Sequence, residues 1–490
     1  MVKTHKNRIH YSNSSTSLKG GKVIGSGGFG CIFKPALKCK NKKKGKTPGD
    51  SITKLMKKKY THKEYNEVMK FYNLLKNIPN FSNYFLVEGF SVCVPDKLST
   101  EDLKDFNEKC KALKKLDIDE DNINDSSSLD QLMALNMPYG GIDVSKYIDE
   151  NWHNSSMMTK LNNSLIKLLE YGLVPMNEAG VFHCDLKSAN ILAREEDGIL
   201  YTRLIDWGLS TVYKNGDTIP KILTNRPFQY NVPFSNIIFT SLFKKMYNAF
   251  LEKNSNPDYY AVRTFVINYV IEWVEKRGPG HLKTMNNIFQ NLFEQDLKIT
   301  EATFKGELIE YDYTFYFIFE YITKILVKFT KDGKFNVMDY FREVFTKNID
   351  IWGFVVSYVP IVEDIINTHK KITPIQLNIL NKIKQLMLIL IESSDHPVDV
   401  NALIENLKDL NSVFTNITHK KLRPVHSSSS SSSLPKKEMM DELNSAEKKA
   451  LYAGSVSSGT RKKVKKRHFH KMIVKTLKNI KSLHSKGEWI

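Results

Sequence analysis

The sequence changes its pattern near residue 138, and this change restricts the fold more than any other feature. Before it, short β-rich runs surround one helical stretch at residues 63–75. The expected strands lie at residues 22–24, 31–33, 51–56, 84–94 and 129–137. After the break at Pro138-Tyr139-Gly140-Gly141, largely helical sequence continues to about residue 410. We therefore predict an α+β chain with a small β-rich lobe, a hinge and a large α-helical lobe.

Composition divides the chain further. Residues 96–130 are charged and acid-rich with weak helical periodicity, so we expect a surface insertion that holds one helix. Past residue 411, a run of seven serines and many lysines cannot bury enough apolar surface to offset the chain entropy. We expect a flexible N-terminus at 1–18, one large domain at 19–410 with lobes at 19–137 and 142–410, and a mostly disordered basic tail at 411–490.

The chain carries 72 Lys and Arg residues against 53 Asp and Glu residues, a formal net charge of +19. Lysines gather at residues 38–46, at 54–59 and in the last thirty residues, so solvated charge on loops and a tail is the ordinary interpretation. The basic stretch at 461–490, which is also a candidate short helix, could instead bind an anionic partner, either nucleic acid or a membrane surface.

No uninterrupted apolar stretch of about 18 residues occurs, and the N-terminus has no apolar leader segment. We expect an intracellular, soluble protein without a transmembrane segment. The five cysteines form no CxxC pair and no His cluster has metal-ligand spacing. Reduced thiols and no zinc site are therefore expected.

A glycine-rich run lies between two expected strands. It comprises Gly25, Ser26, Gly27, Gly28, Phe29 and Gly30. Glycines let the backbone approach phosphate oxygens and present N–H groups to them. An ordinary glycine-rich hairpin turn is the competing interpretation, because the run is weak evidence by itself.

Lys54 lies in an apolar strand-like stretch about 25 residues beyond the glycines, where a phosphate-pairing lysine would sit. A lysine at a strand edge is the competing interpretation. A phosphate-pairing lysine needs an acidic partner on the following helix, and Glu64 and Glu67 lie three residues apart on one helical face. The sequence leaves both glutamates open.

The strongest motif is His183-Cys184-Asp185-Leu186-Lys187-Ser188-Ala189-Asn190, followed sixteen residues later by Asp206-Trp207-Gly208. Phosphoryl transfer needs an aligned hydroxyl, neutralised phosphate charge and bridging metal ions. Asp185 would orient the acceptor hydroxyl, and Lys187 would stabilise the moving phosphoryl group. Asn190 and Asp206 supply the hard oxygen ligands that Mg²⁺ prefers. We expect His183 to hold the loop by packing and hydrogen bonding.

This ordered set of motifs resembles the protein kinase superfamily over about 390 residues. Three phrases are similar to those of serine/threonine kinases from giant nucleocytoplasmic DNA viruses of the mimivirus type, at residues 31–35, 136–141 and 226–234. The resemblance implies a bilobal protein-kinase-like fold, ATP and Mg²⁺ as cofactors, and transfer of the γ-phosphate of ATP to protein serine or threonine hydroxyls. A viral origin would place the protein in the host cytoplasm or the virion.

The resemblance also implies roles for further positions. Ile24 and Leu192 would flank the adenine, Met137 looks like the gatekeeper, Tyr139 lies in the adenine-binding hinge, and Asp143 is a candidate ribose contact. Asp350 resembles the aspartate at the start of the central helix, which typically braces the catalytic loop; an ordinary helix cap is the competing interpretation. An insertion in the large lobe would span about residues 236–345.

Three positions depart from the family pattern. Cys184 stands where many kinases carry an arginine that reads a phosphate on the activation segment. Trp207 replaces the usual phenylalanine of the metal motif. No Ala-Pro-Glu closes the activation segment, and the phrase at residues 226–234 takes its place.

Three competing functions remain. A pseudokinase scaffold would bind nucleotide without transferring phosphate, although every expected catalytic position is filled. A kinase-like phosphotransferase acting on a small molecule or lipid would share the Asp185 loop and Asp206, but Lys187 and the glycine-rich run argue against it. Nucleic-acid binding through the basic tail would be an accessory feature.

Overall fold

The computed structural model describes residues 21–40, 50–303, 312–368 and 372–415, together with 478, 481 and 482. The chain divides into two compact units, Met1–Met69 with Glu88–Tyr139 and Lys70–Val87 with Gly140–Ile490. An antiparallel sheet occupies the first unit and mostly helices the second, so the mixed α+β prediction is confirmed. The expected flexible N-terminus at 1–18 and the serine-rich run at 427–433 lie outside the described residues, as does nearly all of the basic stretch at 461–490.

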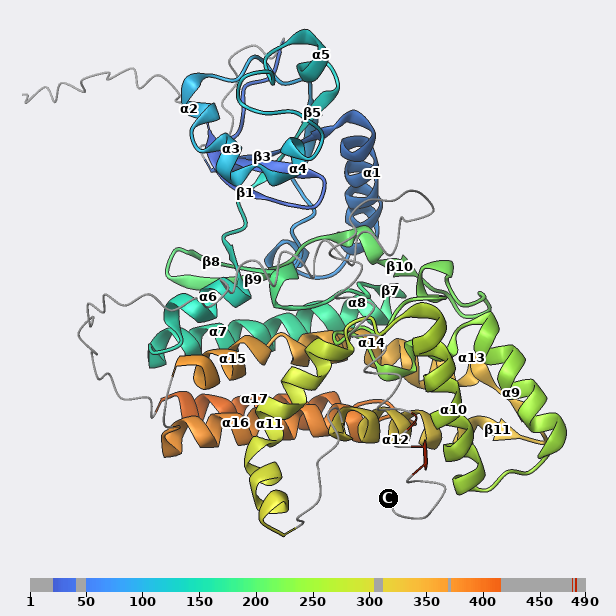
Figure 1. Ribbon diagram of the computed structural model, residues 1–490. Coiled ribbons are helices and arrows are strands. Elements are labelled where there is room, and N and C mark those ends of the chain that lie inside the picture. The colour runs from blue at the N-terminus through green and yellow to red at the C-terminus, as the bar shows by residue number, and fades with distance from the viewer. Residues whose placement is uncertain are drawn as a thin grey trace, which may run out of the picture. The chain divides into compact units, whose positions relative to one another are not determined.

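The first unit is built on a five-stranded antiparallel sheet (Figure 1). Its strands, in spatial order, are β1 (Lys22–Ser26), β2 (Gly30–Lys34), β3 (Ser51–Lys57), β5 (Leu132–Pro138) and β4 (Ser91–Cys93). Helix α1 (Lys58–Leu75) begins directly after β3, five residues before the expected start, because no Gly or Pro interrupts the sequence. The buried Thr61 hydroxyl donates to the carbonyl groups of Lys57 and Met133 and so ties the start of α1 to β5.

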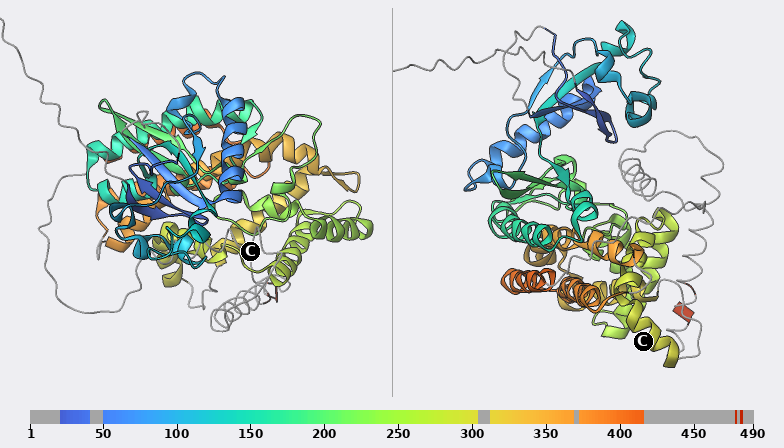
Figure 2. Two further views of the ribbon diagram at one scale, coloured as in Figure 1. Left: turned by 90° about the horizontal axis from the view of Figure 1, so that it is seen from above. Right: turned by 90° about the vertical axis from the view of Figure 1, so that its left-hand side faces the viewer.

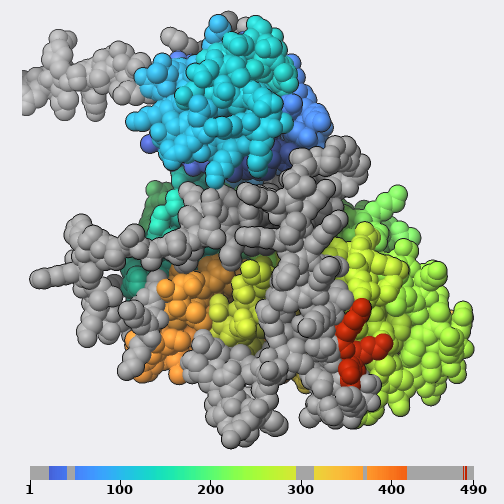
Figure 3. All heavy atoms as spheres, in the orientation of Figure 1, coloured from blue at the N-terminus to red at the C-terminus, as the bar shows by residue number. Residues whose placement is uncertain are grey.

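We expected residues 96–130 to form a surface insertion with one helix. The segment instead contains four one-turn helices. These are α2 (Thr100–Leu103), α3 (Phe106–Lys109), α4 (Lys111–Lys114) and α5 (Ser126–Leu129). Left-handed backbone at Asp105 and Asp117 interrupts any longer helix. Buried side chains of the segment, such as Phe106 and Leu113, join the core formed by the sheet. In the space-filling view this segment, in cyan, covers much of the visible face of the first unit (Figure 3).

The expectation of reduced thiols is wrong for four of the five cysteines. Cys31 on β2 pairs with Cys110 between α3 and α4, and Cys39 pairs with Cys93 on β4. The Cα atoms lie 5.3 and 5.8 Å apart, within the range of about 4.4–6.8 Å that a disulfide requires. The partners are 79 and 54 residues apart in sequence, so only the folded sheet brings them together.

The second unit contains layered helices. They include α6 (Val144–Asn151), α7 (Ser155–Lys167), α8 (Val174–Glu178), α14 (Thr346–Val356), α15 (Val359–Thr368), α16 (Pro374–Glu392) and α17 (Val400–Phe414). Helix α17 packs against both α7 and α16 (Figure 1), and its buried Phe414 lies four residues past the expected domain end at 410. Among the helices that the structure describes, none is long and apolar enough to cross a bilayer.

Besides one short hairpin at residues 330–335, two small sheets in the second unit were not expected from the sequence. Strands β6 (Ile142–Asp143), β8 (Ile191–Glu196) and β9 (Ile199–Leu204) form one sheet, and β9 packs against α7 (Figure 2). Strand β7 (Val181–Phe182) pairs with β10 (Thr211–Val212). The expected strand at 84–94 is shorter, since only Ser91–Cys93 joins the large sheet, while Phe85 forms an isolated bridge to Leu204 of β9.

The described residues between 236 and 345 form a helical region with an aromatic interior. Its elements are α9 (Ser241–Lys253), α10 (Tyr259–Arg277), α11 (Leu282–Thr303), α12 (Asp312–Phe329), the β11 (Thr330–Lys331) and β12 (Lys334–Phe335) hairpin, and α13 (Val337–Tyr340). Rings of α9 and α10 pack edge to face, as Phe243 does on Tyr269 with centroids 5.0 Å apart. Helix α10 is buried around most of its circumference and contacts α12.

Reduction of the two disulfides is expected to destabilise the first unit. Each closes a long loop, and removing a cross-link of this kind typically costs about 2–4 kcal/mol. Thermal unfolding with and without a thiol reductant measures the effect, and mass spectrometry of unreduced peptides checks the pairing. Cys184→Ser should leave the reductant-dependent shift unchanged, because Cys184 is the free cysteine. Identical melting temperatures in the two buffers would contradict the expectation.

Candidate active site

The glycine-rich run forms the turn between β1 and β2, as expected. Strand β1 ends at Ser26, β2 begins at Gly30, and the Gly27 N–H donates to the Gly30 carbonyl oxygen over 2.8 Å. A Cβ atom on Gly30 would lie 2.2 Å from the Cγ of Met56 and 2.4 Å from the Leu55 carbonyl oxygen. Only glycine fits there, because the β2 backbone packs directly on β3.

The tip of this turn lies close to Lys54. A Cβ atom on Gly27 would be 3.8 Å from the Cε of Lys54, and the backbone of Gly27 and Gly28 is exposed. The Phe29 ring packs on Tyr60 of α1 with centroids 4.6 Å apart. The Ser26 hydroxyl accepts a hydrogen bond from the Ala112 N–H, which fastens the turn to the segment 96–130. This last contact was not predicted, because its two residues lie 86 positions apart in the chain.

Lys54 pairs with Glu64 and resolves the choice that the sequence left open. Its ammonium group lies 2.6 and 2.7 Å from the two carboxylate oxygens of Glu64. Glu67 instead lies 3.8 Å from the ammonium group of Lys63, one helical turn away. The Lys54 side chain is 18% exposed and that of Glu64 is 32% exposed, so the pair is partly shielded from solvent.

The expected adenine-binding positions are divided between the two units. In the first unit, Met137 pairs with Ile52 across β5 and β3, and the Tyr139 N–H donates to the Asp50 carbonyl oxygen over 3.0 Å. The ammonium group of Lys34 lies 3.1 Å from the centre of the Tyr139 ring. Ile24 is an exposed side chain of β1.

Asp143 and Leu192 are paired neighbours on β6 and β8 of the second unit. The Asp143 carboxylate caps helix α6, where its Oδ1 accepts from the Lys146 N–H over 2.9 Å. Burial raises the pKa of Asp143 above its ordinary value. This carboxylate therefore has a structural task besides the expected ribose contact.

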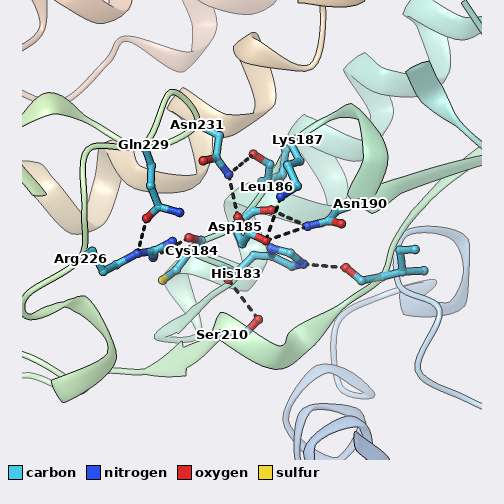
Figure 4. A network of polar contacts seen from close by, with 11 residues as sticks. His183, Cys184, Asp185, Leu186, Lys187, Asn190, Ser210, Arg226, Gln229 and Asn231 are labelled. Atoms are coloured by element: carbon cyan, nitrogen blue, oxygen red, sulfur yellow. Dashed lines mark hydrogen bonds and ion pairs between the residues drawn. The ribbon is translucent and has the colours of Figure 1, made fainter. Parts of the chain in front are cut away.

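Asp185 is the centre of a buried polar cluster in the loop between β7 and β8 (Figure 4). The amide nitrogen of Asn190 donates to the Asp185 carbonyl oxygen over 2.7 Å and to its Oδ2 over 3.1 Å. The ammonium group of Lys187 lies 3.4 Å from the same Oδ2. Asp185, Lys187 and Asn190 are only 6%, 6% and 5% exposed. The three residues that the motif predicts to act together therefore converge on one carboxylate.

Asp206 is held beside this cluster through its neighbour Ile205. The Ile205 N–H donates to the Asn190 carbonyl oxygen over 3.0 Å, and its own carbonyl oxygen lies 2.9 Å from Nε2 of His183. Asp206 itself has left-handed backbone, with φ of 64°, and an exposed side chain. The chain that carries Asp206 is thus attached to the Asn190 backbone and to the His183 ring.

The donor set of Asn190 and Asp206 fits Mg²⁺. The amide nitrogen of Asn190 donates to Asp185, which leaves the amide Oδ1 as one hard oxygen ligand, and the Asp206 carboxylate is a second. Mg²⁺ is usually bound by one or two such groups together with substrate phosphates. Within the described ranges no group of three or more His, Cys, Asp and Glu side chains could hold a metal without such help.

His183 and Trp207 pack against each other under the loop. His183 is fully buried, and its ring centre lies 5.2 Å from that of Trp207. Phe71 also stacks on the indole, with ring centres 5.1 Å apart. The larger ring at position 207 is therefore accommodated by aromatic packing, and the packing and hydrogen-bonding role predicted for His183 matches its contacts.

Asp350 was expected at the start or cap of a helix. It lies instead within helix α14, because helical structure already begins at Val337. Its fully buried carboxylate accepts from the N–H groups of His183 and Cys184, each over 2.8 Å. The Asn177 amide donates to it over 2.8 Å as well. The predicted bracing of the loop is thus present.

The sequence did not assign roles to three polar residues that surround this loop. Arg226, Gln229 and Asn231 are 2%, 3% and 0% exposed. The guanidinium of Arg226 donates to the Cys184 carbonyl oxygen, and the Asn231 amide donates to Oδ1 of Asp185 (Figure 4). The signal that could have found them is the occurrence of polar side chains in an otherwise apolar phrase at residues 226–234.

A scan against models of protein families finds no match, and a search of curated proteins finds no similar sequence.

The Cys184 thiol is expected to be unreactive in the folded protein. Burial raises its pKa well above the ordinary value, so the thiol stays protonated at neutral and mildly alkaline pH. A thiol-specific colorimetric reagent should label the unreduced native chain negligibly at pH 8 and label one thiol in denaturant. Cys184→Ser should abolish the second signal. Rapid labelling of the native chain would contradict the burial of this group.

Replacing the Asp350 acceptor should loosen the loop. Asp350→Asn keeps the side-chain size nearly constant but replaces the charged acceptor of the two N–H groups by a neutral amide. The buried charge-assisted hydrogen bonds are then lost, and the free energy of unfolding should fall by about 3 kcal/mol. Chemical denaturation of wild type and variant measures this difference. Asp409→Asn, at an exposed ion pair with Lys382, is the matched control and should change stability little. Equal stability of the Asp350 variant and wild type would refute the bracing role.

Proposed function

We propose that the protein is an ATP- and Mg²⁺-dependent serine/threonine protein kinase with a bilobal protein-kinase-like fold. The observation that carries the proposal is the convergence of Lys187 and Asn190 on the nearly buried carboxylate of Asp185. Burying charged groups costs stability, so a chain that gathers them in one loop favours a chemical role. The resemblance to kinases of giant DNA viruses supports the same proposal.

The loop can perform the steps that phosphoryl transfer requires. Asp185 would accept a hydrogen bond from the acceptor hydroxyl and align it for attack. Lys187 would stabilise the negative charge of the moving phosphoryl group. Asn190 and Asp206 would hold Mg²⁺, which neutralises phosphate charge. A protein hydroxyl is the proposed acceptor because Lys187 follows Asp185 by two residues, as in the serine/threonine class.

The first unit carries a set of groups suited to nucleotide phosphates. Gly27 and Gly28 are exposed at the turn, Gly27 lies close to Lys54, and Glu64 holds the Lys54 ammonium group by two short contacts. Backbone N–H groups and a fixed cation are what phosphate oxygens need. A pseudokinase would more often have lost one of these groups, and none is missing here.

The test is transfer of labelled phosphate from ATP, with Mg²⁺, to a generic basic protein and to the chain itself. We expect acid-stable label on serine or threonine that a metal chelator abolishes. Asp185→Asn keeps the size of the side chain but removes its charge, so the rate should fall by a factor of about 10²–10⁴. Asp197→Asn, in the exposed turn between β8 and β9, is the matched control and should stay within about twofold of wild type.

The outcomes separate the competing functions. ATP binding without transfer by wild type would favour a scaffold. Transfer to metabolite or lipid acceptors alone would favour a small-molecule or lipid kinase. Equal rates for wild type and Asp185→Asn would remove Asp185 from the centre of the reaction.

A further inference from the structure

Residues 226–231 hold three consecutive residues of the Asp185 loop through buried hydrogen bonds. The guanidinium Nη1 of Arg226 donates to the Cys184 carbonyl oxygen over 2.7 Å. The Asn231 amide donates to Oδ1 of Asp185 over 2.8 Å and to the Leu186 carbonyl oxygen over 3.3 Å. Figure 4 shows both side chains directed at the loop. We call residues 226–231 the clamp segment.

The clamp segment is itself fixed at several points. The Nε of Arg226 donates to Oε1 of Gln229 over 2.6 Å. The Trp352 indole N–H donates to the Tyr230 carbonyl oxygen over 3.0 Å, and the His281 N–H donates to the Phe228 carbonyl oxygen over 2.9 Å. Helix α14 and the chain just before α11 therefore anchor the segment, and its grip on the loop does not rely on exposed side chains.

No phosphate is needed for these contacts. Cys184 occupies the position from which many kinases send an arginine to a phosphate on the activation segment, as the resemblance implies. Here a cation comes from the clamp segment itself and binds the backbone of Cys184. Arg226 is 2% exposed, so a phosphate could reach it only if the segment first moved.

We propose that Arg226 and Asn231 are positioning residues that hold the Asp185 loop in its reactive arrangement without phosphorylation of the activation segment. This inference rests on the proposed kinase function. Asn231 occupies Oδ1 of Asp185, whereas Asn190 and Lys187 approach Oδ2. The carboxylate is thereby fixed in rotation, and one oxygen stays directed toward the other two active groups.

The first test removes the Asn231 donor without changing the side-chain size. Asn231→Leu should lower kcat at least tenfold, while the ATP dissociation constant stays within about twofold, because the lost bond orients Asp185 and does not touch the nucleotide. Asn231→Thr retains a hydroxyl donor and should restore part of kcat. Asn162→Leu is the matched control, since Asn162 is also buried but donates from α7 to the Leu407 carbonyl oxygen of α17. Its kcat should stay within about threefold of wild type.

Hydrogen exchange gives a readout that does not depend on activity. The peptide containing residues 183–187 should exchange at least tenfold faster in Asn231→Leu than in wild type, and not in Asn162→Leu. Arg226→Lys keeps the charge but replaces the separate Nε and Nη1 donors to Gln229 and Cys184 by a single ammonium group, so it should show an intermediate increase. Unchanged kcat and unchanged exchange in Asn231→Leu would overturn the positioning role. An inactive wild type with faster exchange in the variant would remove the kinase proposal but keep the clamp.

The second test asks whether phosphate matters. Wild type treated with a protein phosphatase, and shown by mass spectrometry to lack phosphate on residues 207–225, should keep its activity within about twofold. A variant with Thr218→Ala and Thr224→Ala should behave in the same way. A tenfold loss in the treated protein, regained after incubation with ATP and Mg²⁺, would overturn phosphate independence.

Discussion

The structure of the candidate active site depends on the carboxylate of Asp350. This fully buried group accepts the backbone N–H groups of His183 and Cys184, and Cys184 has left-handed backbone with φ of 59°. A non-glycine residue keeps such a conformation only when its surroundings enforce it. The two hydrogen bonds to Asp350 fix the turn at Cys184. This turn directs the next residue, Asp185, toward Asn190 and Lys187. A buried carboxylate of helix α14 thus determines the direction of the Asp185 carboxylate in the loop.

A second constraint acts on the glycine turn and Lys54 in the first unit. The turn is fastened at Ser26 to the segment 96–130, and the Cys31–Cys110 disulfide binds the same segment to β2. The segment is therefore part of the support of the candidate phosphate-binding groups. Its buried apolar residues also complete the core beneath the sheet. The segment 96–130 was expected at the surface only, but it supports the glycine turn and contributes to the core.

Much of the fold was predictable because the signals were local. The β-rich runs, the break at residues 138–141 and the helical periodicity each reflect neighbouring residues, and the observed strands β1, β2 and β3 lie within two residues of the expected ones. The strands β8 and β9 and the four short helices of 96–130 were missed. Short elements carry few residues of periodicity, and their stability comes from packing against α7 and the large sheet, which no local pattern reveals.

The sequence alone determined which residues gather in the Asp185 loop, because fixed spacing within one loop places Asp185, Lys187 and Asn190 within reach of one another. It also determined the order of the glycine turn, Lys54 and Asp206 along the chain. Only the tertiary structure decided that Glu64 and not Glu67 pairs with Lys54, that Cys31 meets Cys110, and that Asn231 binds Asp185 across 46 residues. Such contacts depend on the geometry of packed elements, and the energies that select them arise only when both partners are buried together.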